Sequence, residues 1–431
     1  MKLYSTNNKE HFTSLKEAVL KGLPEDNGLY MPDEIPVLHQ DFINNIESFS
    51  FQEIAFTVCK ALFNGVISED DLKEIIYDAI NFPAPVVSLK KNIHILELFH
   101  GPSLAFKDFG ARFMARLMSY FDRENEEELV ILVATSGDTG GAVAYGFLQT
   151  LGIKVVILYP SGKVSPFQEK QLTTLGHNIS ALEVNGTFDD CQAMVKHAFL
   201  DQDLRNQIRI SSANSINIAR LIPQSFYYFE AYKQLKNKDN VVFCVPSGNF
   251  GNLTAGLFAK KMGLPIHQFI AATNVNDVVP AYLKTGKFKP RPSVRTVSNA
   301  MDVGNPSNFA RMIDLYCSSG NIKEDIQGYS YTDEETKEAV KEVYQKYNYI
   351  IDPHGAIGYL ALKKHLDQNP SHNGVVLETA HYSKFKDTVD TELEFTTEVP
   401  ERLAILEKRE KKARQIDAEY DLLKAYLLEK R

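Results

Sequence analysis

The stretch VVFCVPSGNFGNLTAGLF, residues 241–258, joins an apolar run to a glycine-rich turn and then to a helical pattern. Its first five residues are all apolar, as in a strand that is buried on both faces. The same order recurs in LVILVATSGDTGG, residues 129–141, and further apolar runs cover residues 154–159, 268–272 and 374–378. Strands that alternate with helices predict an α/β fold with parallel sheets, whose functional site lies at the carboxyl ends of the strands.

Two long helical patterns lie between these strand candidates. Aromatic and leucine side chains recur every four residues from Phe109 to Phe121, which is typical of an amphipathic helix. Residues 218–235 form a second periodic stretch, whose helix we expect to begin near Ile216. Both helices fit the alternation that the strands require.

The chain divides into three parts. Residues 1–90 carry mixed helical signals and end in a proline-rich boundary, so we expect them to pack on the core. Residues 91–390 form the α/β region, with a smaller subdomain of about residues 110–205 inserted in the larger one. Residues 391–431 are rich in Glu, Lys and Arg with scattered leucines, which predicts a helical tail. That tail is either a surface helix or a docking segment, and a mixed charge run is usually a solvated face.

Composition excludes several classes of protein. The chain has 431 residues, of which 44% are hydrophobic and 24% charged, so it is globular and long enough for more than one core. Its net charge of -8 offers no basic surface for nucleic acid. Four cysteines lie far apart with no CxxC spacing, which predicts a reducing compartment and no zinc site. Without a secretory signal or a membrane-spanning run, we expect a cytoplasmic protein.

Lys107 is the strongest candidate for chemistry. It lies in HGPSLAFKDFG, residues 100–110, between aromatic residues at the start of the first predicted helix. A lysine that forms a Schiff base must lose its proton, and apolar neighbours favour the neutral amine. For a lone lysine a solvated side chain would be the better interpretation. The two glycine-rich loops that follow strand candidates favour the reactive amine instead.

The loop at residues 247–252 is a candidate phosphate site. Gly248 and Gly251 lie between a buried strand and a helix start. Glycines allow backbone amides to approach an anion closely, and the helix amino terminus attracts negative charge. An ordinary strand-to-helix turn is the alternative, because GxxG alone is a weak pattern.

The loop at residues 135–141 offers hydroxyls and amides together, which suits a carboxylate. It is not a Walker loop, since the Gly-Lys-Ser/Thr ending is absent. A third segment, residues 211–220, opens the second helix with Asn and Ser, which could simply cap it. Arg220 lies one turn inside and can present a fork of donors to a dianion. Lys163 is another cation near a helix start, either a substrate contact or a solvated lysine.

Seven motifs in fixed order resemble those of the threonine synthase family, in its longer bacterial and fungal branch. They are HGPSLAFKDFG (100–110), ATSGDTG (134–140), GKVSPFQEKQL (162–172), NSINIARL (214–221), PSGNFGN (246–252), DPHGA (352–356) and ETAHYSKF (378–385). The resemblance extends from Tyr4 to about Phe385, with no departure at a motif position. It implies fold-type II, the tryptophan synthase β-like architecture of two parallel-sheet domains, with an amino-terminal extension.

The resemblance also implies a reaction and a set of roles. The enzyme would be a lyase that converts O-phospho-L-homoserine and water to L-threonine and phosphate with pyridoxal 5'-phosphate, the last step of threonine biosynthesis. By similarity, Lys107 is the Schiff-base lysine and Thr379 lies at the pyridine nitrogen. The remaining cofactor residues by similarity are Asp138, Gly248, Asn249, Phe250, Gly251 and Asn252. The substrate residues by similarity are Thr135, Ser136, Gly137, Thr139, Lys163, Asn214, Ser215 and Arg220.

Two other interpretations stay open. A fold-type II threonine or serine dehydratase would share Lys107 and the phosphate loop but would need no second anion site. A pyridoxal-phosphate-binding protein without catalysis is the other, and the intact Lys107 argues against it. No metal motif is present, because His100, His354 and His381 lack the spacing of zinc ligands. We expect a small-molecule substrate, no nucleic-acid or membrane partner, and a monomer or homodimer.

Overall fold

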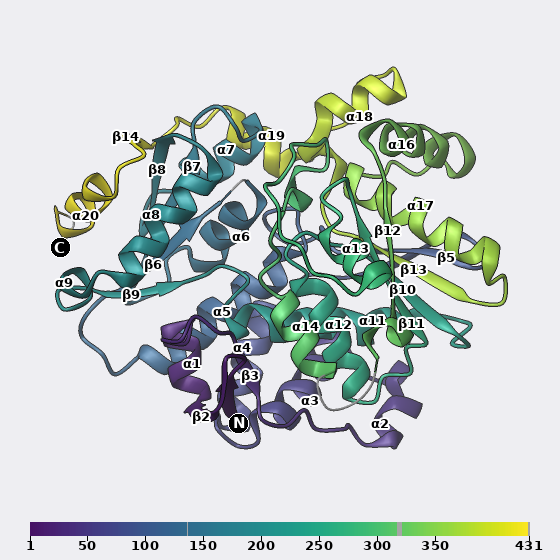
Figure 1. Cartoon of the computed structure of the whole chain (residues 1–431), viewed down its shortest axis with the longest axis horizontal. Helices are drawn as coiled ribbons and strands as arrows, with labels where there is room; N and C mark the ends of the chain where they lie inside the picture. The colour runs from purple at the N-terminus through teal and green to yellow at the C-terminus, as the bar shows by residue number, and fades with distance from the viewer. Residues whose placement is uncertain (136, 317–320, 430–431) are drawn as a thin grey trace.

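The strand runs form two separate sheets in the computed structural model, which describes residues 1–135, 137–316 and 321–429 (Figure 1). The larger sheet has the order β12 (Ile326–Ser330), β11 (Gln268–Thr273), β10 (Val241–Pro246), β13 (Asn373–Glu378), β5 (Ile93–Glu97) and β4 (Val86–Lys90). The smaller has the order β14 (Arg414–Asp417), β8 (Ile179–Asn185), β7 (Ile153–Pro160), β6 (Leu129–Ala134) and β9 (Arg209–Ser212). Only β4 is antiparallel to its neighbour among these strands. The predicted parallel α/β class is therefore confirmed.

Helices cover both sheets, and Figure 1 shows the two sheets as neighbouring lobes. Every residue of β6, β10 and β13 is buried, which explains why these strands read as continuous apolar runs. The helices around the smaller sheet are α5 (Lys107–Asp122), α6 (Asp138–Phe147), α7 (Pro166–Thr173), α8 (Phe188–Leu200) and α9 (Gln202–Arg205). Those of the larger lobe are α12 (Gly251–Lys261), α13 (Val278–Thr285), α14 (Phe309–Tyr316), α15 (Ile322–Asp325), α16 (Asp333–Tyr347), α17 (Pro353–Gln368) and α18 (Lys386–Leu393).

The amino-terminal segment packs on the core, as expected. It contains an antiparallel sheet of β2 (Asn8–Ser14), β1 (Lys2–Ser5) and β3 (Tyr30–Pro32), followed by helices α1 (Leu15–Lys21), α2 (Gln40–Asn44), α3 (Phe51–Phe63) and α4 (Glu69–Ala79). Phe51 and Phe82 both contact the ring of Phe109 on α5. The extension therefore rests directly against the helix that begins at Lys107.

The periodic stretch at residues 218–235 is not one helix, which corrects that prediction. It forms α10 (Ile218–Leu221), a 3-10 turn at residues 222–225, and α11 (Phe226–Gln234). Pro223 lies at the interruption, and proline cannot donate the backbone hydrogen bond that a continuous helix needs. The first helix begins at Ile218 rather than at Ile216, because the side chain of Asn217 caps it.

The carboxyl-terminal tail docks on the molecule, the second of its two alternatives, and it contains an edge strand, which corrects the purely helical tail. It forms α19 (Glu401–Glu407), the edge strand β14, and α20 (Tyr420–Glu429). Leu403 and Leu406 pack against Leu104, just before the candidate lysine, and Leu423 and Tyr426 join the core of the smaller lobe. The scattered leucines of the tail thus form its buried apolar side, while its charged residues face outward.

In the part of the chain that the structure describes, no helix is long and apolar enough to cross a membrane.

Candidate active site

The carboxyl ends of three neighbouring strands bring the main sequence motifs together. β5, β13 and β10 lie side by side and run in one direction. Lys107 follows β5, Thr379 follows β13, and the loop at residues 247–252 follows β10. The backbone N–H of Phe106 donates to the carbonyl of Thr379 over 2.8 Å. Lys107 and Thr379 are therefore held next to each other, as their predicted roles require.

The environment of Lys107 favours the neutral amine. Burial lowers the pKa of this lysine to about 8, because an apolar surrounding disfavours the ammonium ion. The carboxylate of Asp138 acts against this shift, whereas the positive charges of Lys384 and Arg220 add to it. These three charged side chains define the electrostatic surroundings of the candidate nucleophile.

Asp138 and Lys384 form a buried ion pair beside Lys107. The ammonium nitrogen of Lys384 lies 2.6 Å from Oδ1 of Asp138, and Gln168 donates to the same oxygen over 2.9 Å. Burial alone would raise the pKa of Asp138, but the charges of Lys384 and Lys107 outweigh it and hold that pKa well below its usual value. Asp138 is thus a permanent carboxylate at neutral pH.

Lys384 was missed as a site residue by sequence reasoning. It stands in the ETAHYSKF motif, with Tyr382 and Phe385 beside it, as Lys107 stands between aromatic residues. That apolar flanking was the available signal. Lys384 also donates to the carbonyl of Ser103 over 3.0 Å, so it ties the loop before Lys107 to the Asp138 region.

The loop before Lys107 is fixed by several further contacts. The N–H of Ser103 donates to Oδ2 of Asp108 over 2.8 Å, and Gln171 donates to the Ser103 carbonyl over 3.0 Å. From the docked tail, Arg402 donates to the carbonyl of Gly101 over 2.9 Å. Lys107 consequently projects from a backbone that both lobes and the tail hold in place.

The loop at residues 135–141 is organised by Thr135. Its hydroxyl oxygen accepts from the N–H groups of Gly137 over 3.0 Å and Gly140 over 2.8 Å. The hydroxyl of Thr135 is thereby engaged within the loop, and Thr139 is partly exposed. Ser136 lies outside the described residues. Substrate binding by this loop stays a prediction.

The loop at residues 247–252 presents unused backbone donors. Asn252 is held inside it by a bond from Ser247 over 3.0 Å and by its own bond to the Pro246 carbonyl over 2.8 Å. Among the described residues, none accepts a hydrogen bond from the N–H groups of residues 248–252. Such a nest of free amides at the start of α12 suits a phosphate group.

The two glycines of this loop, Gly248 and Gly251, differ in the room around them. A Cβ on Gly248 would lie 2.8 Å from the carbonyl oxygen of Ala300, so the packed backbone leaves no room. A Cβ on Gly251 would meet nothing closer than 3.5 Å, the side-chain amide of Asn308. A Cβ on Gly251 would thus fit at ordinary van der Waals distance from its neighbours.

The segment at residues 211–220 lies against the same region. Arg220 is buried and donates to the carbonyl of Ala213 over 2.6 Å, while its Nε has no partner among the described residues. Burial lowers the pKa of Arg220 to about 10, with the charge of Asp108 acting against the shift. Asn214 donates to the Ala134 carbonyl over 3.3 Å, and its Oδ1 is also unpartnered. These unsatisfied groups are what an anion-binding segment would leave for its ligand.

Lys163 is not brought into this cluster. It is exposed on the turn after β7, and it is absent from the charges that act on Lys107. The solvated alternative fits this placement, and a role in substrate binding stays a prediction.

His354 takes a supporting position. Its Nδ1 lies 2.7 Å from Oδ1 of Asp352, and its Nε2 accepts from the N–H of Ala300 over 3.3 Å. Ala300 in turn packs against Gly248, so this histidine braces the phosphate loop. Within the described ranges, no group of three or more His, Cys, Asp or Glu is placed to hold a metal ion.

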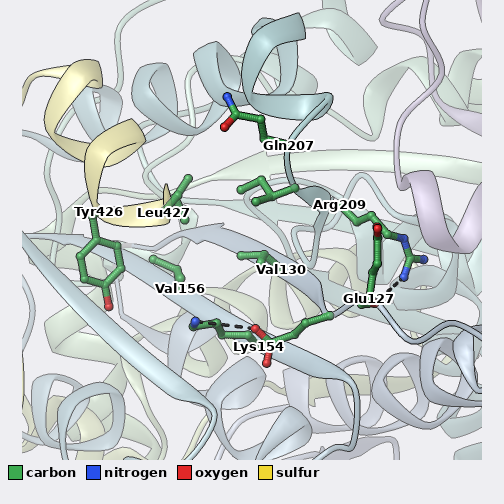
Figure 2. Close-up of a pocket in the computed structure, with 10 residues that line it drawn as sticks. Glu127, Val130, Lys154, Val156, Gln207, Arg209, Tyr426 and Leu427 are labelled. Atoms are coloured by element: carbon green, nitrogen blue, oxygen red, sulfur yellow. Dashed lines mark hydrogen bonds and ion pairs between the residues drawn. The ribbon is translucent and has the colours of Figure 1, made fainter. Parts of the chain in front are cut away.

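Two hollows complete the description. One of about 480 Å³ opens beside Lys384 and is lined by Ser165, Pro166, Phe167, Arg295, Thr296, Val297, Asn299, Asp333, Lys384, Phe385, Lys386, Asp387 and Thr388. The other, of about 230 Å³, lies beneath α20 in the smaller lobe (Figure 2). Its cations are engaged, since Lys154 lies 3.6 Å from Glu128 and Arg209 pairs with Asp122. The first hollow is thus the one that leads toward the candidate site.

A lysine of lowered pKa at the strand ends, in a chain whose glycine-rich loop leaves backbone amides free at a helix start, is typical of the fold-type II pyridoxal-phosphate enzymes. Residues 80–379 match the model of the family described as "Pyridoxal-phosphate dependent enzyme". Residues 2–80 match "Threonine synthase N terminus", and residues 355–427 match "Threonine synthase, C-terminal". The chain belongs to the threonine synthase family.

Individual relatives agree over the full length. Threonine synthase of Haemophilus influenzae is 45% identical over 430 residues, which cover 99% of this chain and 100% of that protein. The crystal structure of threonine synthase from Escherichia coli has a TM-score of 0.95 and 41% identity, and 100% of both chains is covered. The structure of PLP-bound threonine synthase from Brucella melitensis has a TM-score of 0.91 and 35% identity, covering 99% of this chain and 98% of that chain.

Proposed function

We propose that this protein is a pyridoxal-phosphate-dependent threonine synthase that converts O-phospho-L-homoserine and water to L-threonine and phosphate. One observation carries the proposal: two candidate anion sites, the loop at residues 247–252 and the segment at residues 211–220, meet beside Lys107. The Cβ position of Gly251 in the first is 3.8 Å from Cβ of Ser215 in the second. A cofactor phosphate and a substrate phosphate require two such sites, whereas a dehydratase requires one.

The cofactor would be held by residues of this chain that suit it. The free amides of residues 248–252 would bind its phosphate, and the Lys107 amine would hold its aldehyde carbon. Thr379 would place a neutral hydroxyl at the pyridine nitrogen, and Asp138 a carboxylate near the ring hydroxyl. Pyridoxal phosphate, when bound, withdraws electrons from the carbon skeleton of the amino acid.

Lys107 would act as the proton carrier of the reaction. Once the substrate amine has replaced it, the free lysine amine can remove the α proton and then a β proton. A pKa near 8 leaves a sizeable neutral fraction at neutral pH, as a base requires. Arg220 and Asn214 would bind the phosphate that leaves the γ carbon, and that carbon would gain a proton to become the methyl group. Water then adds at the β carbon, and the α carbon would regain a proton from Lys107. The loop at residues 135–139 would orient the substrate carboxylate.

The test of this assignment is substrate preference. We expect the holoenzyme to release phosphate from O-phospho-L-homoserine with a kcat/KM far above that for ammonia release from L-threonine or L-serine. Preferred deamination of L-threonine or L-serine would support the dehydratase alternative. Binding of pyridoxal phosphate with turnover of none of the three would support the non-catalytic alternative.

The proposal extends to partners and location. We propose a cytoplasmic enzyme with a small-molecule substrate, present as a monomer or homodimer. Sedimentation of the holoenzyme distinguishes the two assemblies, and a trimer or tetramer would contradict both.

Replacing Gly251 with Val is expected to weaken cofactor binding about tenfold or more, because a side chain at this position hinders the close approach of the loop amides to the cofactor phosphate. The fold should tolerate the change, since the nearest atom to a Cβ there is 3.5 Å away. Gly251→Ala should give an intermediate affinity. Titration of the apoprotein with pyridoxal phosphate measures the effect, and wild-type affinity in Gly251→Val would show that the phosphate binds elsewhere.

Replacing Lys384 with Gln is expected to raise the pKa of Lys107. Burial is the main cause of the lowered pKa of Lys107, and the substitution leaves it in place. The substitution removes the positive charge of Lys384, which lowers this pKa further, and it frees the Asp138 carboxylate, which raises this pKa. The neutral amine then appears at higher pH. The rate of Lys107 acylation in the apoprotein should therefore rise at higher pH in the variant than in the wild type.

The matched control for this measurement is Lys386→Gln, two residues further along, where the lysine pairs with Asp390. Its acylation profile should match the wild type. A Lys384→Gln profile that is unchanged or moves to lower pH would refute the electrostatic account of Lys107.

A further inference from the structure

Arg311 of α14 is a buried cation without an acidic partner. Its side chain is fully buried, and its guanidinium donates to the carbonyls of Tyr30 over 3.1 Å, Ser215 over 3.3 Å and Ile216 over 2.7 Å. It also donates to Oδ1 of Asn308 over 2.7 Å. No Asp or Glu of the described chain pairs with it. A buried charge is ordinarily neutralised by an opposite charge, so this one calls for an anion.

Two of the four acceptors of Arg311, Ser215 and Ile216, belong to a candidate anion site. Ser215 and Ile216 lie in the segment that would hold the substrate phosphate. Asn308 donates through its side chain to the Ser215 carbonyl over 3.4 Å and through its backbone to the Asn249 carbonyl over 3.2 Å. Arg311 and Asn308 thus join the phosphate loop to the substrate segment.

The contacts of Arg311 also set the direction of a peptide group. In a trans peptide the N–H points opposite to the carbonyl, so the N–H of Ile216 faces away from Arg311. Among the described residues it has no hydrogen-bond acceptor. A carbonyl that accepts from a cation makes the N–H of the same peptide a stronger donor. The Ser215–Ile216 peptide is therefore oriented and polarised to receive an anion.

The amino-terminal extension takes part in this arrangement. Tyr30 lies on β3 of the small antiparallel sheet, and its carbonyl accepts from Nε of Arg311. On the other side of the segment, Asn217 donates to the carbonyl of Val19 over 2.9 Å. Residues 214–217 are consequently fixed between the extension and α14.

We propose that Arg311 is a positioning residue for the substrate phosphate: it fixes the Ser215–Ile216 peptide and Asn308, and a bound anion balances its charge. The identity of the anion rests on the proposed function, whereas the binding of a phosphate group does not. The alternative is that Arg311 only cross-links α14 to the amino-terminal extension. The experiment must distinguish this structural role from the positioning role.

The first measurement uses the holoenzyme, in which the cofactor occupies the loop at residues 247–252, with inorganic phosphate as probe. Thermal unfolding of the wild type should shift to higher temperature in phosphate relative to chloride at equal ionic strength, because phosphate binds the native state. Arg311→Met should lose most of this shift. The matched control is Arg112→Met, which removes another buried arginine whose guanidinium donates to the carbonyls of Ala79 and Asp78. That variant should lose stability but keep the phosphate shift.

The second measurement uses the holoenzyme and the less disruptive variant Arg311→Lys. A lysine keeps the charge but cannot reproduce the fork of donors. We expect KM for O-phospho-L-homoserine to rise about 10- to 100-fold with a much smaller change in kcat. Pyridoxal phosphate absorbance should be unchanged.

The outcomes separate the possibilities. A wild-type phosphate shift in Arg311→Met, or a wild-type KM in Arg311→Lys, would overturn the proposal and leave a structural cross-link. If Arg311→Met does not fold, the phosphate shift is measured on Arg311→Lys instead. A reduced shift supports the proposal, and a shift equal to that of the wild type overturns it. Failure of the proposed function would look different: the wild type would not turn over O-phospho-L-homoserine, while its Arg311-dependent phosphate shift would persist.

Discussion

Lys107→Ala is expected to purify as a folded protein that has lost turnover by at least about a thousandfold, since the change removes both the covalent anchor of the cofactor and the base. The fold should survive, because the described contact of the Lys107 amine is with the ring of Phe106 at 5.9 Å, so its removal breaks no described hydrogen bond or ion pair. Threonine formation and the visible absorbance of protein-bound cofactor are the two readouts. Both should be lost together.

The control for this prediction is Lys341→Ala, which removes an exposed lysine on α16 that pairs with Glu394. It should retain both readouts. Appreciable threonine formation by Lys107→Ala would show that another group carries the proton, with Lys384, whose charge acts on Lys107, the next amine to consider.

Arg220→Ala is expected to keep cofactor binding but to lose most of its kcat/KM for O-phospho-L-homoserine. Loss of a charged contact to a buried dianion costs about 2–5 kcal/mol, which corresponds to roughly 30-fold to several thousandfold. The structure adds a second reason, because Arg220 also holds the Ala213 carbonyl in the same segment. Steady-state phosphate release measures the effect.

Arg220→Lys should recover only part of this loss, since an ammonium group cannot bind both the carbonyl and the phosphate as a planar fork does. Both variants should bind pyridoxal phosphate as the wild type does. A kcat/KM near that of the wild type in Arg220→Ala would place the substrate phosphate elsewhere, with Lys163 the next residue to test.

The sequence was sufficient for the features that local chemistry determines. Continuous apolar runs followed by glycine-rich loops predicted the parallel strands and where their carboxyl ends lie. Aromatic flanks singled out Lys107, and the structure provides the burial that lowers its pKa. The break at Pro223 was missed, although proline rarely occupies a helix interior.

Other features depend on contacts between distant parts of the chain. Lys384 becomes a site residue only because folding places it against Asp138, which lies 246 positions earlier in the chain. Arg311 gave no signal, since arginine is usually exposed. The strand β14 is four residues within a charged run, and its pairing with β8 determines its structure more than its own composition does.

The most direct test of the central claim is the product balance of the wild-type holoenzyme with O-phospho-L-homoserine as the sole amino acid. The account predicts one molecule of L-threonine for each molecule of phosphate, because water adds at the β carbon after the phosphate has left the γ carbon. Phosphate release accompanied by a keto acid and ammonia instead of threonine would contradict it.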